Sequence, residues 1–212
     1  MNWRRMPLGL VQANAYIWKN DQGECLIFDP GGEPKKLITY VKEKQLTPLA
    51  VLLTHAHFDH IGGADEVRNE WKIPLYVHKK EREWLTNAAL NGSAKLIGNE
   101  ITINEAEELI DSEGVLQIGS FKLQLFHTPG HSPGSVSYYS AEDGFVISGD
   151  TLFQGGIGRT DLTGGSQTVL LRSIHDKLLT LPESTIVLSG HGEETTVLTE
   201  QEQNPFIHGF SL

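Results

Sequence analysis

The sequence predicts an α/β fold in which strands that end at polar residues are followed by helices. Two observations support this class. Apolar, strand-like runs recur along the chain, and several of them stop at a histidine or an aspartate. The 212 residues, 39% of them hydrophobic, suffice for one sizeable core, and no Pro/Ser-rich linker divides them. We therefore expect a single domain over residues 1–212, with two halves of strands and flanking helices whose division falls in the loop at residues 87–99.

The first half contains three strand-like segments and one helical segment. Residues 10–18 and 25–28 are strand-like, and the continuous apolar run at residues 49–53 is typical of a strand buried on both faces. Residues 65–71 favour a helix. The polar loop between the last two segments is therefore anchored at both ends.

That loop carries a dense set of candidate metal ligands. It has the sequence T-H-A-H-F-D-H and contains His55, His57, Asp59 and His60. His55 and His57 lie two apart in an extended segment, so they point the same way and can share one metal. Asp59 and His60 come after the chain begins to turn, which suits them to a second metal beside the first.

Three strand-like runs of the second half also lead to candidate ligands. These runs cover residues 121–127, 144–150 and 185–191. The first enters the turn T-P-G-H-S-P-G with His131 at its centre, the second ends at Asp150 and the third at His191. A lone strand-end Asp or His more often caps a turn or makes a hydrogen bond. Four strand ends of the same architecture indicate ligands instead, because imidazole and carboxylate groups hold borderline metals such as zinc.

The motif H-x-H-x-D-H, followed by a single His, a single Asp and a last His, resembles the signature of the metallo-β-lactamase fold hydrolases over residues 8–206. The resemblance implies a four-layer αββα sandwich of two mixed β-sheets flanked by helices, with the metals at one edge of the sheets. It also implies which donors bind each ion. Metal one takes His55, His57 and His131, metal two takes Asp59, His60 and His191, and Asp150 bridges both.

Asp29, which ends the strand at residues 25–28, matches an early aspartate of this family that supports the metal ligands. The other interpretation is a turn acid before Pro30-Gly-Gly32. The residues alone favour neither interpretation.

Within the family, the motifs T-P-G-H-S-P-G-S, G-D-T-L-F, G-H-G-E-E-T-T and N-P-F are similar to the short glyoxalase II-like, or hydroxyacylglutathione hydrolase-like, group. Residues 155–161 also resemble a stretch of the iron-dependent persulfide dioxygenases. Full-length glyoxalase II enzymes contact glutathione through an additional C-terminal helical region, whereas this chain ends soon after His191. In that family a basic residue aligned with Arg159 contacts the thiol carrier of the substrate. A salt bridge to Asp161 is the alternative role for Arg159.

The resemblance implies a metal-dependent hydrolase with a dinuclear site. Its expected reaction is hydrolysis of a small acyl thioester, such as a 2-hydroxyacyl thiol conjugate, by attack of a metal-bridging hydroxide. Asp59 would orient that hydroxide through its second oxygen. The expected cofactors are two divalent ions, with zinc favoured and iron or manganese accepted by the same ligands.

Other functions remain as alternatives. A mononuclear iron persulfide dioxygenase would need only His55, His131 and Asp150, and other hydrolases share this fold. A binding module without chemistry would not require seven intact ligands.

Charge and cysteine content bound the partners. The net charge is −10, with 17 basic residues scattered among 27 acids, so we expect no nucleic-acid partner. The mixed cluster at residues 79–82 is typical of a solvated helix face. Cys25, the only cysteine, is expected to be a buried structural thiol. No apolar stretch approaches the roughly 20 residues of a membrane span, so we expect a cytoplasmic enzyme of a small-molecule substrate without a membrane partner.

Four further histidines are expected to lie outside the ligand set. They are His78, His127, His175 within an amphipathic helix at residues 169–181, and His208. Of these, His208 is the one expected to touch substrate, if the tail folds back. The pair Tyr138-Tyr139 is expected to place one ring in a strand core and the other on its surface.

Overall fold

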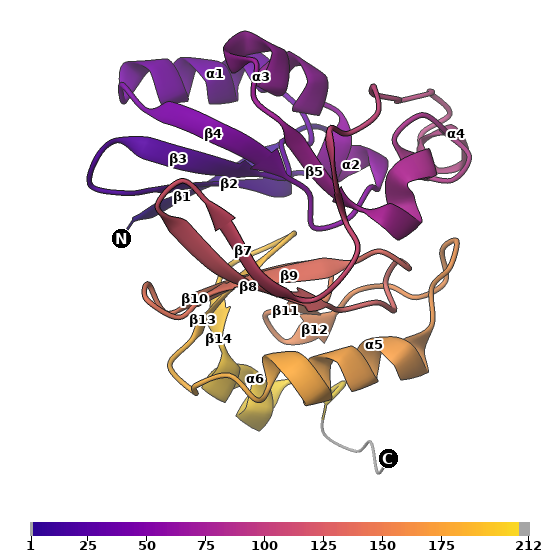
Figure 1. Cartoon of the computed structure of the whole chain (residues 1–212). Coiled ribbons are helices and arrows are strands. Elements are labelled where there is room, and N and C mark those ends of the chain that lie inside the picture. The colour runs from indigo at the N-terminus through magenta and orange to yellow at the C-terminus, as the bar shows by residue number, and fades with distance from the viewer. Residues whose placement is uncertain (1, 208–212) are drawn as a thin grey trace. The chain divides into compact units, whose positions relative to one another are not determined.

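The computed structural model describes residues 2–207 and divides the chain into two compact units (Figure 1). Unit 1 comprises the residues up to Asp111 together with Gln117–Phe121. Unit 2 comprises Ser112–Leu116 and the residues from Lys122 onward. The division falls later than the predicted loop at residues 87–99, because the strand Glu108–Ile110 still pairs in the sheet of unit 1. His208 lies outside the described residues.

Unit 1 is built on a six-stranded mixed sheet in the order β1-β2-β3-β4-β5-β6. The first three strands pair antiparallel, and β3 to β6 pair parallel. The strands are β1 (Trp3–Leu8), β2 (Ala13–Lys19), β3 (Glu24–Phe28), β4 (Thr47–Leu52), β5 (Leu75–His78) and β6 (Glu108–Ile110). The helices are α1 (Pro34–Glu43), α2 (Phe58–Ile61), α3 (Ala64–Trp71), the 3-10 helix η1 (Lys79–Trp84) and α4 (Ser93–Leu96). Figure 1 shows α1 and α3 together on one face of this sheet.

The core of unit 1 includes the strand that leads into the histidine-rich loop. Residues 50–53 at the end of β4 are fully buried, as the apolar run predicts. The predicted strand at residues 10–18 is wrong at its start, because the chain first forms β1 and then turns at Gly9–Gln12 before β2 begins. Gly9 and Gln12 both have positive φ, at 72° and 55°, and this turn is why Leu10 is 84% exposed.

Unit 2 contains a second six-stranded mixed sheet, in the order β14-β13-β10-β9-β8-β7. Within it β10 and β13 pair parallel, whereas β8, β9 and β10 pair antiparallel in turn, as do β13 and β14. Its strands are β7 (Gly114–Ile118), β8 (Phe121–His127), β9 (Val136–Ser140), β10 (Phe145–Gly149), β13 (Ile186–Ser189) and β14 (Thr195–Thr196), beside a hairpin of β11 (Leu152–Phe153) and β12 (Gly156–Ile157). The helices are α5 (Gln167–Ser173), the π-helical turn η2 (Ile174–Leu178) and α6 (Val197–Gln203).

The core of unit 2 lies between its sheet and these helices. Leu170, Ile174 and Leu178 pack on Val146 of β10 and Val187 of β13. The predicted helix at residues 169–181 is therefore α5 continued by η2. Tyr138 is fully buried and its neighbour Tyr139 only partly so, which confirms the core-and-surface prediction for this pair.

Together the units confirm an α/β fold with two mixed sheets and flanking helices. Cys25 is fully buried in β3, and burial raises the pKa of its thiol to about 12. Among residues 2–207 no helix has the length and apolar character required to cross a bilayer.

Candidate metal centre

The four predicted ligands of unit 1 lie on one connection between a strand and a helix. β4 ends at Leu52, the next residues are extended, and α2 begins at Phe58. His55 and His57 thus lie on extended backbone, whereas Asp59 and His60 lie in the first turn of α2, as the sequence predicts. The histidines at 55, 57 and 60 are 1%, 4% and 0% exposed. Short-range spacing therefore concentrates three buried imidazoles and a carboxylate in one place.

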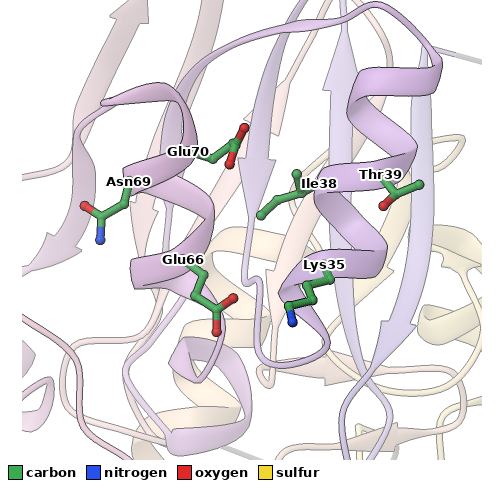
Figure 2. A pocket seen from close by; sticks show the side chains of 6 residues that line it. All are labelled: Lys35, Ile38, Thr39, Glu66, Asn69 and Glu70. Atoms are coloured by element: carbon green, nitrogen blue, oxygen red, sulfur yellow. The ribbon is translucent and has the colours of Figure 1, made fainter.

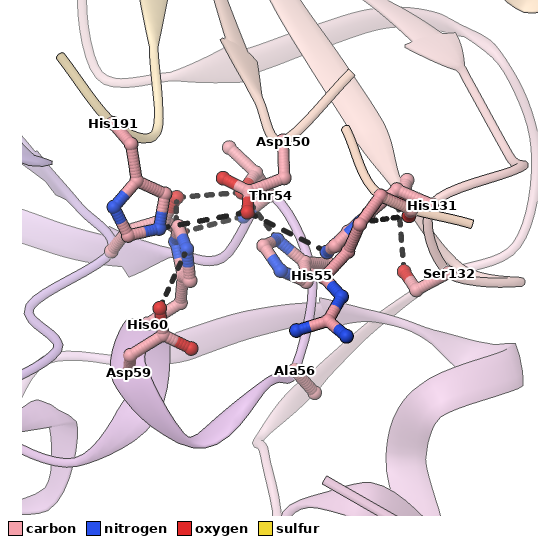
Figure 3. A network of polar contacts seen from close by, with 12 residues as sticks. Thr54, His55, Ala56, Asp59, His60, His131, Ser132, Asp150 and His191 are labelled. Atoms are coloured by element: carbon pink, nitrogen blue, oxygen red, sulfur yellow. Dashed lines mark hydrogen bonds and ion pairs between the residues drawn. The ribbon is translucent and has the colours of Figure 1, made fainter. Parts of the chain in front are cut away.

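Asp29 supports this cluster from the position directly after the neighbouring strand β3. Its carboxylate accepts hydrogen bonds from the Thr54 backbone N–H at 2.7 Å and from Thr54 Oγ1 at 2.6 Å. It also contacts His60 Nδ1 at 3.0 Å (Figure 3 shows Thr54 and His60). Asp29 is 1% exposed and adopts φ 47°, a conformation that aspartate tolerates better than most residues. The structure thus places Asp29 in contact with a predicted ligand, beyond the role of a simple turn acid.

These contacts fix which ring nitrogen of two histidines carries the proton. A carboxylate only accepts, so His60 Nδ1 must donate to Asp29. Thr54 has one hydroxyl hydrogen, which it donates to Asp29, so the contact of 3.1 Å between Thr54 Oγ1 and His55 Nδ1 requires the histidine to donate. In both rings Nε2 is then the lone-pair nitrogen, which is the form that binds a metal.

Glycines bring the Asp29 loop against α2. A Cβ added to Gly31 would lie 1.5 Å from the Asp59 carbonyl oxygen, and one added to Gly63 would lie 2.8 Å from the Pro30 carbonyl oxygen. Gly63 N also donates to that Pro30 oxygen at 2.8 Å. The run Pro30-Gly31-Gly32 is therefore packed backbone to backbone on the loop that bears the ligands.

Unit 2 brings two of its predicted ligands, His131 and His191, close to the third, Asp150. Asp150 follows β10, and His191 follows β13 after one glycine. Since β10 and β13 are parallel neighbours, their carboxyl ends lie at the same edge of the sheet. Asp150 Oδ2 lies 3.5 Å from His131 Nε2 and 3.6 Å from His191 Nε2. Figure 3 shows the Asp150 carboxylate between the two rings.

The backbone of the following loop orients His131. Its Nδ1 lies 2.8 Å from the Arg159 carbonyl oxygen, which only accepts, so Nδ1 is protonated and Nε2 is the lone-pair nitrogen. The loop comes close because Gly158 has no side chain: an added Cβ would lie 1.8 Å from the Asp150 carbonyl oxygen and 3.1 Å from His131 Cβ. The third predicted ligand of unit 2, His191, contacts an aromatic ring: the Phe153 ring meets the His191 ring edge-on, with centroids 6.2 Å apart.

The spacing of these donor atoms fits a divalent metal. Two ligands on a tetrahedral zinc ion at 2.0–2.1 Å are separated by about 3.4 Å. The measured separations are 3.7 Å between His60 Nε2 and Asp59 Oδ2 in unit 1, and 3.5 and 3.6 Å around Asp150 in unit 2. Asp150 is near His131 and His191 at once, which is the arrangement expected of a shared ligand.

Arg159 does not lie buried among the ligands. Its guanidinium is about half exposed and makes two hydrogen bonds of 2.8 Å to the Asp161 carboxylate. Hydrogen bonding to Asp161 raises the pKa of the Arg159 guanidinium. The salt bridge considered from the sequence is therefore present, and the Arg159 backbone carbonyl rather than its side chain contacts a ligand.

Two residues that contact the ligand loop were not predicted from the sequence. Glu81 was placed on a solvated helix face, and this is wrong: it is 0% exposed, and its carboxylate accepts from the Ala56 N–H at 2.6 Å. Trp84 packs against the His57 ring with centroids 5.4 Å apart. Their spacing of three residues, which puts both on one face of a 3-10 helix, was the available signal.

Two of the histidines predicted as bystanders make other contacts. His78 Nδ1 accepts from the Lys80 N–H, and His127 Nε2 lies 3.0 Å from the Pro133 carbonyl oxygen. His175 lies in η2, away from the set around Asp150 in sequence and element.

Unit 1 also has an open surface groove of about 610 Å³ between α1 and α3 (Figure 2). It is lined by Lys35, Ile38, Thr39, Glu66, Asn69 and Glu70. None of the predicted ligands lines it, and its side chains are mixed in charge.

Two curated relatives are similar over the whole chain. A probable metallo-hydrolase, YqgX of Bacillus subtilis, is 65% identical over 212 residues and covers 100% of both chains. The hydroxyacylglutathione hydrolase GloC of Haemophilus influenzae is 32% identical, also with 100% of both chains covered.

Two solved structures are also similar to this chain over nearly its whole length. BLEG-1, described as a B3 metallo-beta-lactamase, is 57% identical with a TM-score of 0.97, covering 98% of this chain and 100% of that one. TTHA1623, in a di-iron-bound form, is 39% identical with a TM-score of 0.85, covering 96% and 99%. The family profile of the metallo-beta-lactamase superfamily matches residues 8–191, which include all seven predicted ligands. The chain therefore belongs to the metallo-beta-lactamase superfamily and is a metallo-hydrolase.

Proposed function

We propose that this metallo-hydrolase cleaves small acyl thioesters with two divalent metal ions. His55, His57 and His131 would hold one ion, Asp59, His60 and His191 the other, and Asp150 both. The observation that carries the proposal is the ligand geometry within each unit: buried imidazoles with Nε2 as the lone-pair nitrogen, and carboxylate oxygens at ligand spacing. The di-iron form of TTHA1623, at 39% identity, supports two ions per chain, and zinc remains our expected metal.

The chain's own residues have defined tasks in this reaction. When bound, two divalent ions would lower the pKa of a water molecule and polarise the substrate carbonyl. Asp59 has a second carboxylate oxygen with which to orient the attacking water. Asp29 holds the proton on His60 Nδ1 directly and on His55 Nδ1 through Thr54, which keeps both rings in the ligating form. No serine or cysteine nucleophile is needed, in keeping with the burial of Cys25.

Similarity to GloC, whose name specifies hydroxyacylglutathione, supports a thioester as substrate. We infer a 2-hydroxyacyl thioester and assign Arg159 to its thiol-carrier portion. The guanidinium is about half exposed and is oriented by its two hydrogen bonds to Asp161. An exposed ion pair of this kind contributes little to stability. A substrate carboxylate or amide would replace Asp161 on the same planar fork of donors.

A second candidate is hydrolysis of β-lactams. The specific observation in its favour is the 57% identity to BLEG-1. Both reactions add water to a strained or activated carbonyl, so the same ligand set serves either one.

The test is a metal analysis of the purified protein, combined with a substrate panel. We expect two ions per chain and release of thiol from 2-hydroxyacyl thioesters of glutathione and of smaller thiols. Ring opening of β-lactams at a higher kcat/KM would favour the second candidate. One iron per chain, together with oxygen consumption when a persulfide is added, would contradict both hydrolase candidates and favour the dioxygenase alternative.

A further inference from the structure

The 3-10 helix η1 packs its inward face on the loop that carries the unit 1 ligands. Residues 79, 80, 82 and 83 of η1 are exposed, whereas Glu81 and Trp84 are buried, at 0% and 5%. A 3-10 helix repeats every three residues, so these two side chains lie on one face. A buried acid on an otherwise solvated, mixed-charge helix is costly unless its charge is compensated by hydrogen bonds.

Glu81 contacts the backbone of the ligand loop directly. Its Oε2 accepts from the Ala56 N–H at 2.6 Å, and Ala56 is itself fully buried. Ala56 lies between His55 and His57, so its N–H belongs to the peptide group that joins His55 to the rest of the loop. Fixing that peptide restricts the backbone on which both imidazoles are mounted.

Two further contacts extend the support along the loop. The Trp84 ring packs on the His57 ring, and the Asn91 carbonyl oxygen accepts from the Phe58 N–H at 3.1 Å. Three successive positions, 56 to 58, are therefore contacted by η1 and the segment after it. Asp29 meets the same loop at Thr54 and His60, so the histidine segment is held at both ends and in the middle.

The geometry points to Glu81 as a positioning residue for metal binding: its hydrogen bond to Ala56 sets the backbone that aims His55 and His57. In this role Glu81 acts through the Ala56 backbone. The inference rests on the metal part of the proposed function and is independent of the substrate. Residues that orient metal ligands typically change metal affinity 10–100-fold when they are removed.

The test compares Glu81→Leu, which removes the acceptor, with Glu81→Gln, which keeps an acceptor oxygen. Glu83→Leu and Glu83→Gln are matched controls on the exposed face of the same helix. Affinity for Zn²⁺ is measured by competition with a chelator, and the visible spectrum of the Co²⁺-loaded protein reports ligand geometry. We expect Glu81→Leu to weaken Zn²⁺ binding at least tenfold and to alter the Co²⁺ spectrum. Glu81→Gln and both controls should stay within about threefold of wild type.

The inference is overturned if Glu81→Leu binds both metals like wild type and loses only thermal stability, or if Glu81→Gln is as impaired as Glu81→Leu. If Glu81→Leu fails to fold, the hydrogen bond is tested by hydrogen exchange of the Ala56 amide instead. The exchange rate is measured in the metal-free wild type and in metal-free Glu81→Gln. Strong protection in both supports the hydrogen bond, and exchange as fast as that of an exposed turn amide such as Leu10 overturns it. A wild-type chain that binds two metals but cleaves no thioester refutes the proposed substrate alone, whereas one that binds no metal refutes both proposals.

Discussion

The two units assemble their ligands by different means. In unit 1, four donors lie within six residues. Their placement follows from the single connection that leads from β4 into α2. In unit 2, three donors come from distant points of the chain and meet because β10 and β13 pair in parallel and the loop at Gly158 packs on Asp150. Local spacing thus determines the first set and tertiary packing the second. We expect unit 1 to depend on the contacts that orient its loop, and unit 2 on the residues that bring its elements together.

The largest effect is expected at Asp150, the residue that lies near the two predicted ligand histidines of unit 2. Asp150→Ala should lower metal content to zero or one ion per chain and reduce turnover by orders of magnitude, since removal leaves His131 and His191 without their common neighbour. His175→Ala, in the same unit, should change neither quantity by more than about twofold. Elemental analysis together with kcat measures both. Two tightly held ions in Asp150→Ala would exclude the residue from the metal centre.

Glycine substitutions compare the two means of assembly directly. Gly31→Ala places a Cβ on the Asp59 carbonyl oxygen of unit 1, and Gly158→Ala places one on the Asp150 carbonyl oxygen of unit 2. Each should cost at least about 1–3 kcal/mol of stability through overpacking and should also reduce metal content.

Gly156→Ala is the control for Gly158→Ala, because its Cβ would make only an ordinary contact, 3.7 Å from Phe153 Cβ. Thermal unfolding and metal analysis of the three variants test the expectation. Equal behaviour of Gly156→Ala and Gly158→Ala would show that the close approach to Asp150 is unimportant.

A smaller effect is expected from the hydrogen bonds of Asp29. Asp29→Asn keeps the shape and tolerates the positive φ, but it replaces one acceptor oxygen with a donor group. It should weaken metal binding about 10–100-fold. Thr54→Val removes the hydroxyl contacts with Asp29 and His55 but keeps the contact between Asp29 and His60, so it should weaken metal binding less. Chelator competition measures both affinities, with the exposed Asp21→Asn as control. If Thr54→Val proves the more damaging of the two, the assigned proton positions are wrong.

The smallest effect is expected at Arg159, which lies on the surface of unit 2. Arg159→Ala should raise KM several-fold with little change in kcat, because its contact would be made equally in ground and transition states. Metal content should stay at the wild-type level. Asp161→Asn is the partner variant and should leave KM unchanged or lower it, since it releases the guanidinium. An unchanged KM in Arg159→Ala would leave the ion pair as the whole role of this residue.

How much could be predicted from the sequence follows the same division. The strand before His55, the helix after Asp59 and the strand ends at Asp150 and His191 were predicted because hydrophobic periodicity and ligand spacing are local signals. The family resemblance supplied the grouping of ligands.

Features that depend on distant packing were not predicted. The mixed charges of residues 79–82 gave no indication that Glu81 is buried, because that burial depends on the ligand loop against which η1 packs. The strand β1 was missed since its arginines and proline hide its alternation. The division of the chain was placed too early, because the short strand β6 is defined by its pairing with β5 and not by its composition.

The burial of Cys25 has a consequence for redox chemistry. Burial raises the pKa of the Cys25 thiol to about 12 and leaves it no exposed surface, so the thiol stays protonated near neutral pH. Thiol–disulfide exchange requires a thiolate with access to its partner. A disulfide reagent added to detect released thiol would therefore not exchange with Cys25 of the folded protein. Colorimetric reagents for thiols would then detect product without a background from the enzyme itself.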